Sequence, residues 1–152
     1  MSADNFINKD FENNKLIIKL KTQIKELDIY KKIDIIILFG SRARKDHDIK
    51  SDLDLAFLLK ADFFKKINVI DLRIDLVNYF SELTEIESDI IFLNSAKPLL
   101  KFQVIKYGKL IYKNDNFDYA SYFSKTLKEY FDFKYYKEYH YQKMRERLSE
   151  ST

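Results

Sequence analysis

The chain has 152 residues, of which 46% are hydrophobic and 34% are charged, a composition that can bury the core of one globular domain. It has no cysteine and only two histidines, His47 and His140, which excludes disulfide frameworks and thiolate metal sites and argues against zinc. A net charge of +3 is too small to indicate nucleic-acid binding by itself. No apolar run approaches a membrane span and residues 1–14 lack a signal-peptide core, so we expect a cytoplasmic protein that binds neither membrane nor nucleic acid directly.

The first half of the chain alternates between helical and strand patterns. Apolar residues at helical spacing predict a helix over residues 16–27. A run rich in β-branched residues predicts a buried strand over residues 33–39, and a second strand is expected over residues 54–59. A long apolar stripe then predicts one helix over residues 63–83.

The second half continues this alternation. A third strand is expected over residues 89–93, close to the second. Pro98 suits the first turn of a helix that ends near Gly108, and residues 110–113 form a short extended piece. Residues 118–148 have a helical pattern, either as one helix or as a bent or broken one. The alternation indicates an α/β (α+β) fold, in which a small mixed sheet is flanked by helices.

A polar run, Asn114-Asp115-Asn116, is the expected boundary between a core over residues 1–113 and a C-terminal helical extension over residues 114–152. The extension is aromatic and basic, since eight of the 11 tyrosines lie at or beyond Tyr112. Such a segment can cover the sheet as core, dock a partner protein, or bind RNA. We expect its earlier half to be core and its later half to contact a partner.

The most informative motif lies between the first two expected strands. Gly40 and Ser41 follow the first strand, and Asp52 and Asp54 open the second. Two residues apart on a strand, the carboxylates leave the same face, where a hard cation such as Mg²⁺ usually relieves their repulsion. The Gly-Ser turn opens a helix N-terminus, whose free N–H groups favour phosphate. A phosphate cradle beside paired carboxylates is what nucleotidyl transfer needs.

Three further residues are candidates for the same site. Two-metal catalysis usually takes a third carboxylate from a neighbouring strand, and Asp89 opens the third strand. Arg42 and Arg44 follow the Gly-Ser turn directly, where guanidinium groups can neutralise triphosphate charge. Because they are two apart on a short helix, both should not face one ligand. We favour Arg42 and keep Arg44 as a second candidate.

The runs that carry these features resemble a known family. In chain order they are Leu-Phe-Gly-Ser-Arg-Ala-Arg at 38–44, Ser-Asp-Leu-Asp-Leu at 51–55, and weaker runs at 88–96, 98–100 and 108–112. Together they resemble the DNA polymerase β-like nucleotidyltransferases and, among these, the minimal nucleotidyltransferases that serve as MntA-type antitoxins of HEPN/MNT toxin–antitoxin pairs. The resemblance covers residues 33–113 and departs at Lys45, where these antitoxins commonly have glycine.

The resemblance implies a polymerase β-like core that moves AMP from ATP to a tyrosine hydroxyl of a cognate HEPN ribonuclease toxin. The catalytic and Mg²⁺-binding residues of a two-metal site would be the three carboxylates, Asp52, Asp54 and Asp89. The nucleotide-binding residues would be those of the turn and the helix it opens, Gly40, Ser41, Arg42 and Arg44. A stable hetero-oligomer with the toxin is also implied.

Two other hypotheses stay open. A small-molecule nucleotidyltransferase of aminoglycoside type would keep the chemistry and change the acceptor, although such enzymes usually carry a larger C-terminal domain than residues 114–152 provide. A non-catalytic antitoxin would neutralise the toxin by docking alone. The intact Gly-Ser turn and the three aspartates argue against loss of catalysis, and they leave inhibition by docking open.

Overall fold

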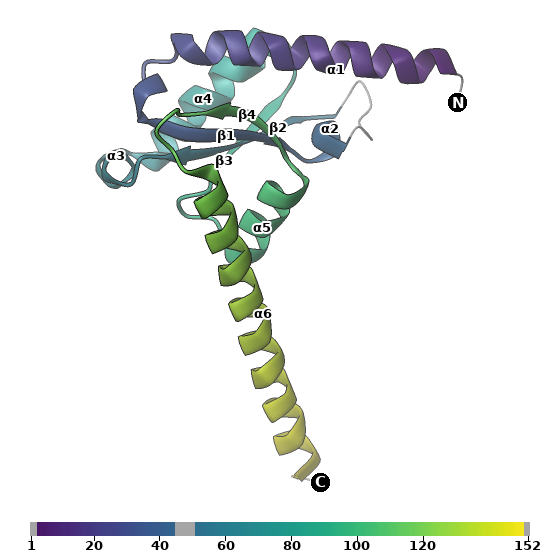
Figure 1. Ribbon diagram of the computed structural model, residues 1–152, viewed down its shortest axis with the longest axis vertical. Coiled ribbons are helices and arrows are strands. Elements are labelled where there is room, and N and C mark those ends of the chain that lie inside the picture. Colours follow the sequence, from purple (N-terminus) through teal and green to yellow (C-terminus); the bar gives the residue numbers. More distant parts are fainter. Residues whose placement is uncertain (1–2, 45–50, 151–152) are drawn as a thin grey trace.

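The computed structural model describes residues 3–44 and 51–150, with side chains described from Asn13 onward in the first segment. Lys45, which departs from the family pattern, lies outside the described residues. The centre of the protein is a four-stranded mixed sheet of order β3-β2-β1-β4 with helices on both faces (Figure 1). The expected α/β fold is therefore confirmed.

The strands follow the predicted runs closely. β1 (Ile33–Phe39) is antiparallel both to β2 (Leu53–Leu59) and to β4 (Lys109–Lys113). β2 is parallel to β3 (Ser88–Phe92), so the expected proximity of the second and third strands is confirmed. Residues from Ile35 to Leu38 are all buried, because helices cover both faces of the central strands.

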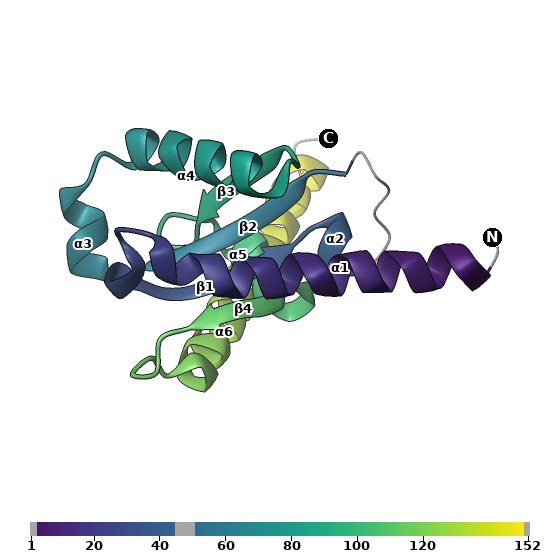
Figure 2. The ribbon, with the colours of Figure 1, turned by 90° about the horizontal axis from the view of Figure 1, so that it is seen from above.

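One face of the sheet packs against α1 (Ala3–Gln23) and α4 (Val69–Thr84), which Figures 1 and 2 show on the same side. The larger core lies here, with Leu20 of α1 and Phe80 of α4 fully buried against the strands. The first helix begins at Ala3, well before the predicted residue 16. Short 3₁₀ turns at Ile24–Glu26 and Tyr30–Lys32 lead from α1 into β1.

The single helix predicted over residues 63–83 is wrong, because the chain forms two helices there. α3 (Ala61–Lys66) ends before Asn68, whose side-chain Oδ1 accepts a hydrogen bond from the Asp71 N–H at 3.2 Å and caps α4. The apolar stripe runs through both helices and hides this break. α4 ends at Thr84 and is capped by Glu85, which has a left-handed backbone with φ of 58°.

The opposite face packs against α5 (Pro98–Tyr107) and α6 (Tyr119–Glu150), and α6 is one continuous helix. Its first turns cover the sheet with Tyr122 and Phe123, and Tyr130 stacks on Phe102 of α5 at 4.1 Å between ring centroids. These first turns of α6 therefore pack against the core. From Phe131 to Glu150 every residue is exposed, and the helix projects away from the sheet (Figure 1).

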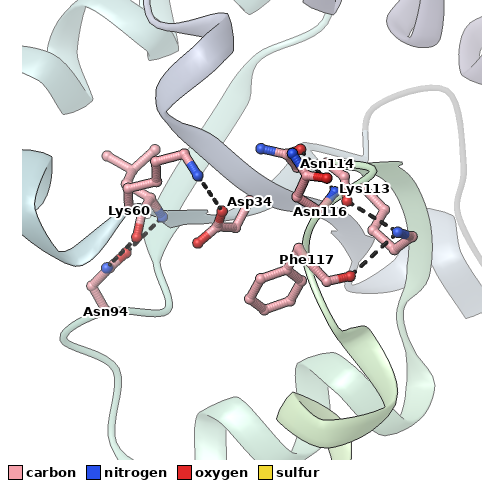
Figure 3. Close-up of polar contacts among 8 residues, drawn as sticks. Asp34, Lys60, Asn94, Lys113, Asn114, Asn116 and Phe117 are labelled. Atoms are coloured by element: carbon pink, nitrogen blue, oxygen red, sulfur yellow. Dashed lines mark hydrogen bonds and ion pairs between the residues drawn. The ribbon is translucent and has the colours of Figure 1, made fainter.

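Polar contacts close the end of the sheet where β2 finishes (Figure 3). Lys60 lies 3.5 Å from the carboxylate of Asp34. The Asn94 side chain accepts a hydrogen bond from the Leu59 N–H at 2.9 Å and donates one to the Leu59 carbonyl at 2.8 Å. The Asn114 N–H donates to the Asp34 carbonyl at 2.8 Å. These contacts hold the ends of β1, β2 and β4 in register with the loop after β3. The division at residues 113 and 114 stays a prediction.

In the part of the chain that the structure describes, every helix is either too short or too polar to cross a bilayer.

Candidate active site

The predicted carboxylates meet at the other end of the sheet, where β1 ends and β2 begins. Asp54 on β2 is the register partner of Phe39 on β1 and of Asp89 on β3. Because neighbouring strands lie about 4.8 Å apart, the Asp54 and Asp89 side chains leave the same face of the sheet as close neighbours. Asp52 directly precedes β2 and is exposed. The fold therefore brings two of the three candidate carboxylates into register and keeps the third beside them.

Gly40 closes this end of the site, between β1 and the short helix α2 (Ser41–Arg44). Its φ of 74° is in the left-handed region that favours glycine. A Cβ at this position would collide with the carboxylate of Asp54. Position 40 therefore needs glycine for two reasons: the left-handed turn and the close approach of the Asp54 carboxylate to the backbone.

The carboxylate of Asp54 is in an unfavourable environment for its charge. Burial raises its pKa above the ordinary value of 3.8, and the negative charges of Asp89 and Asp52 raise it further. The nearby Arg44 guanidinium partly opposes this and lowers the pKa. Several negative groups gathered around a partly buried carboxylate are typical of a site that binds a cation or a cationic complex.

Asp89 has a partner that the sequence did not reveal. The Arg73 guanidinium of α4 donates a hydrogen bond to Asp89 Oδ1 at 2.9 Å, and both side chains are about half exposed. α4 packs on the face of the sheet opposite Asp89, so Arg73 reaches past the edge strand β3 to make this contact. Arg73 is the one basic residue of α4, but only the packing of this helix against β3 brings it to Asp89.

Two of the candidate phosphate-binding residues lie in different environments. Arg42 is 7% exposed, and its Nε and Nη2 atoms donate to the Ser51 carbonyl at 3.2 and 3.0 Å. This bidentate contact ties α2 to the residue that precedes Asp52. Ser41 is half-buried as the first residue of α2. The phosphate roles of Ser41 and Arg42 stay predictions.

Arg44 is exposed and lines a cavity of about 440 Å³ between Gly40 and α5. The α5 side of this cavity is formed by Leu100, Gln103 and Tyr107. It combines an apolar wall, an aromatic ring, an amide and a guanidinium, which suits a ligand with both a planar and an anionic part. Nothing in the sequence pattern singles out Gln103 or Tyr107, because their relation to Gly40 depends on the position of α5.

Comparison with known proteins identifies the family. The family described as "Polymerase beta, Nucleotidyltransferase" matches residues 21–117, more than half of the chain. The chain belongs to the polymerase β nucleotidyltransferase family. A relative from Methanocaldococcus jannaschii bears the name "Putative protein adenylyltransferase". It is 38% identical over 76 residues, which are 50% of this chain and 72% of the relative.

Solved structures agree with this nucleotidyltransferase fold. One chain of a toxin–antitoxin crystal structure with AMP-PNP matches with a TM-score of 0.65 and 26% identity, over 87% of this chain and 97% of its own length. A rebuilt structure of tri-AMPylated Shewanella oneidensis HEPN toxin with MNT antitoxin matches with a TM-score of 0.60 and 24% identity, over 90% of this chain and 98% of its own. The second likeness supports the fold alone. The polymerase β-like core predicted from the sequence is confirmed.

Polymerase β-like nucleotidyltransferases imply a divalent metal, and the donor chemistry of this site is compatible with one. In residues 3–44 and 51–150, the structure contains no group of three or more His, Cys, Asp or Glu side chains already arranged to hold an ion. Mg²⁺ is commonly held by one or two carboxylates together with substrate phosphates. The register pair of Asp54 and Asp89 supplies such oxygen donors. Burial and, after it, the charges of Asp89 and Asp52 raise the pKa of Asp54, and a bound cation would favour its ionised form.

Proposed function

We propose that this chain is an antitoxin that transfers AMP from ATP to a tyrosine hydroxyl of a cognate HEPN ribonuclease toxin in the cytoplasm. The observation that carries this proposal is the register pairing of Asp54 and Asp89 directly beside the left-handed Gly40. The relative named as a protein adenylyltransferase and the toxin–antitoxin structure with AMP-PNP support a protein acceptor and an adenine nucleotide.

In this proposal the triphosphate of ATP lies at the Gly40–Ser41 turn. Glycine lets the backbone approach the phosphates, and the Ser41 hydroxyl and N–H donate to them. Arg44 lines the adjacent cavity and supplies positive charge, so it is now a stronger candidate than Arg42, whose guanidinium is bonded to Ser51. The rest of the nucleotide then occupies the cavity beside Gln103 and Tyr107.

The carboxylates act on the other reactant. The tyrosine oxygen forms a bond to the α-phosphorus as the bond to the bridging oxygen of pyrophosphate breaks, and pyrophosphate leaves with that electron pair. Asp89 accepts the tyrosine proton and passes it to solvent. Asp52, Asp54 and Asp89 would hold Mg²⁺, which when bound neutralises charge on the phosphates. The attached AMP adds bulk and negative charge to the toxin, which disables its active site.

Docking without catalysis is the second candidate, and the distal part of α6 offers a surface for docking. Eight large apolar or aromatic side chains are exposed there, namely Phe131, Phe133, Tyr135, Tyr136, Tyr139, Tyr141, Met144 and Leu148. Tyrosine and other aromatic residues are enriched in interface hot spots. We propose that this half of α6 contacts the toxin, which would keep the two proteins in one hetero-oligomer whether or not transfer occurs.

The test is the intact mass of the protein encoded beside this chain, after co-expression with wild type or with the Asp52→Ala/Asp54→Ala variant. A gain of whole AMP units with wild type alone supports the transferase. If the mass does not increase but a stable complex forms, the result supports docking without catalysis. Neither mass gain nor complex contradicts both antitoxin proposals and leaves a small-molecule acceptor as the hypothesis to test.

A further inference from the structure

A groove of about 560 Å³ runs along α4 beside the edge strand β3, on the far side of the carboxylates from the Gly40 cavity. Its wall is formed by Val69, Ile70, Ile74 and Val77 of α4. At one point the wall is charged, because Arg73 and Asp89 also line the groove. The groove is therefore lined by one of the candidate catalytic carboxylates, Asp89, whereas none of the three lines the Gly40 cavity.

The apolar wall is unusually open to solvent for isoleucine. Ile70 is 71% exposed and Ile74 is 52% exposed, and the four-residue spacing places them on one ridge of α4. The core face of the same helix is separate and carries Leu76 and Phe80. Because α4 already has a buried face, the isoleucine ridge contributes little to the fold, and such a ridge next to a site is typical of a binding surface.

The other rim of the groove is the edge strand of the sheet, β3. β3 pairs with β2 on one side and is the last strand of the sheet on the other. Asp89 lies on this strand, bonded to Arg73 across the edge. A side chain that entered the groove would thus have aliphatic contacts along α4 and a carboxylate with its guanidinium partner at its polar end.

We propose that this groove seats the acceptor segment of the protein substrate, with the tyrosine ring against Ile70 and Ile74 and its hydroxyl at Asp89. The inference rests on the proposed transferase function and specifies which surface receives the acceptor tyrosine of the toxin, in addition to the contact proposed for α6. A tyrosine suits the groove because its ring is apolar and its hydroxyl needs a polar partner. In an in-line displacement the acceptor oxygen and the leaving pyrophosphate lie on opposite sides of the phosphorus, which matches separate hollows for acceptor and nucleotide.

Arg73 has a defined task in this arrangement. Its hydrogen bond to Asp89 Oδ1 fixes the orientation of the carboxylate at the groove and leaves Oδ2 without this contact, so that it can face the reactants. Arg73 is therefore a positioning residue. Lysine in its place would keep the charge and lose the planar guanidinium geometry.

The experiment measures AMP transfer from α-labelled ATP to the protein encoded beside this chain, with either substrate varied in turn. The variants are Ile70→Glu and Ile74→Glu, and the matched control is Ile18→Glu, since Ile18 is 66% exposed and lies on α1, which does not line the groove. We expect the KM for the acceptor protein to rise at least about tenfold in both groove variants, as for an interface hot spot. The KM for ATP should stay within about twofold, and the control should match wild type.

A photo-crosslinking residue in place of Ile74 gives an independent readout. A crosslink to a tyrosine-bearing peptide of the acceptor protein supports the groove, and a crosslink only to a second copy of this chain overturns it. Active groove variants with an unchanged acceptor KM also overturn it and leave the transferase proposal standing. A wild-type chain that transfers no AMP instead contradicts the proposed function, and the acceptor role of the groove with it.

Discussion

Polar and charged side chains lie at both ends of the sheet, but the two ends differ in how well these side chains are paired. Where β2 finishes, polar groups are matched, since Lys60 pairs with Asp34 and Asn94 makes two hydrogen bonds to Leu59 (Figure 3). Where β2 begins, Asp54 and Asp89 are register partners of like charge, and burial together with neighbouring aspartates raises the pKa of Asp54. At the second end Arg73 pairs with Asp89, but burial and the neighbouring aspartates still raise the pKa of Asp54 despite the nearby Arg44.

This difference indicates which end is structural and which is functional. A matched polar cluster lowers the free energy of the folded chain by itself. Carboxylates held together against their repulsion, beside a glycine with a φ of 74°, cost stability and are usually retained because a ligand compensates for them. Removing the Asp54 charge should therefore lower activity and raise stability, whereas substitutions at the matched end should lower stability and leave activity unchanged.

Asp54→Asn should have the largest effect. The amide keeps the shape of the side chain and removes the charge, so we expect AMP transfer to fall at least about a hundredfold. The free energy of unfolding at pH 7 should rise, because the unfavourable charge is gone. Asp34→Asn at the matched end is the control and should keep transfer while losing some stability. Transfer assays and urea unfolding of both variants check the pair, and an active Asp54→Asn protein would remove the distinction between the ends.

The stabilisation by Asp54→Asn should depend on pH with a defined sign. Because the folded-state pKa of Asp54 is raised, its protonated form is favoured in the folded protein, and that stability is lost as the pH rises through the folded-state pKa. The advantage of the Asn variant should thus be greatest at neutral pH and shrink toward pH values below the ordinary 3.8. Urea unfolding across this range measures it, and a constant advantage would argue against a charge effect.

Gly40→Ala should be the next largest change. A left-handed alanine costs about 1–2 kcal/mol, and its Cβ would collide with the Asp54 carboxylate. We expect transfer to fall at least about tenfold because the carboxylate and the phosphate turn are both displaced. The loss of transfer activity should be larger than the unfolded fraction of the variant explains. Transfer assays and urea unfolding curves measured in parallel make this comparison. Wild-type activity in a folded Gly40→Ala protein would show that the close approach has no catalytic importance.

Asn94→Ala should affect stability alone. It leaves both the N–H and the carbonyl of Leu59 without their side-chain partner, which costs about 1–3 kcal/mol. Transfer by the folded fraction should stay within about twofold of wild type, since this end is remote from the carboxylates. A selective loss of transfer would mean that the matched end communicates with the site.

Lys60→Met should have the smallest effect. The Lys60 side chain is 44% exposed and its pair with Asp34 is 3.5 Å long, so its loss should cost about 0–1 kcal/mol. Urea unfolding at low and high salt checks this, because the difference from wild type should shrink as salt screens the pair.

The sequence predicts the sheet better than it predicts the surroundings of the site. The bounds of β1 are as expected, and Asp54 and Asp89 were placed on neighbouring strands because each opens an apolar run. The break at Asn68 was missed because the apolar stripe continues across it, although Asn68 is a good helix cap. Arg73, Gln103 and Tyr107 could not be found, because each reaches the site from a helix whose position only tertiary packing determines.

AMP transfer at the carboxylate end of the sheet is best tested by following label from ATP to the protein encoded beside this chain, with the label on either the α- or the γ-phosphorus. We expect the α-label to become acid-stable on that protein, the γ-label not to, and the Asp52→Ala/Asp54→Ala variant to abolish the α-signal. Labelling from the γ-phosphorus, or α-labelling that survives in the double variant, would contradict the assignment of AMP transfer to the carboxylate end of this sheet.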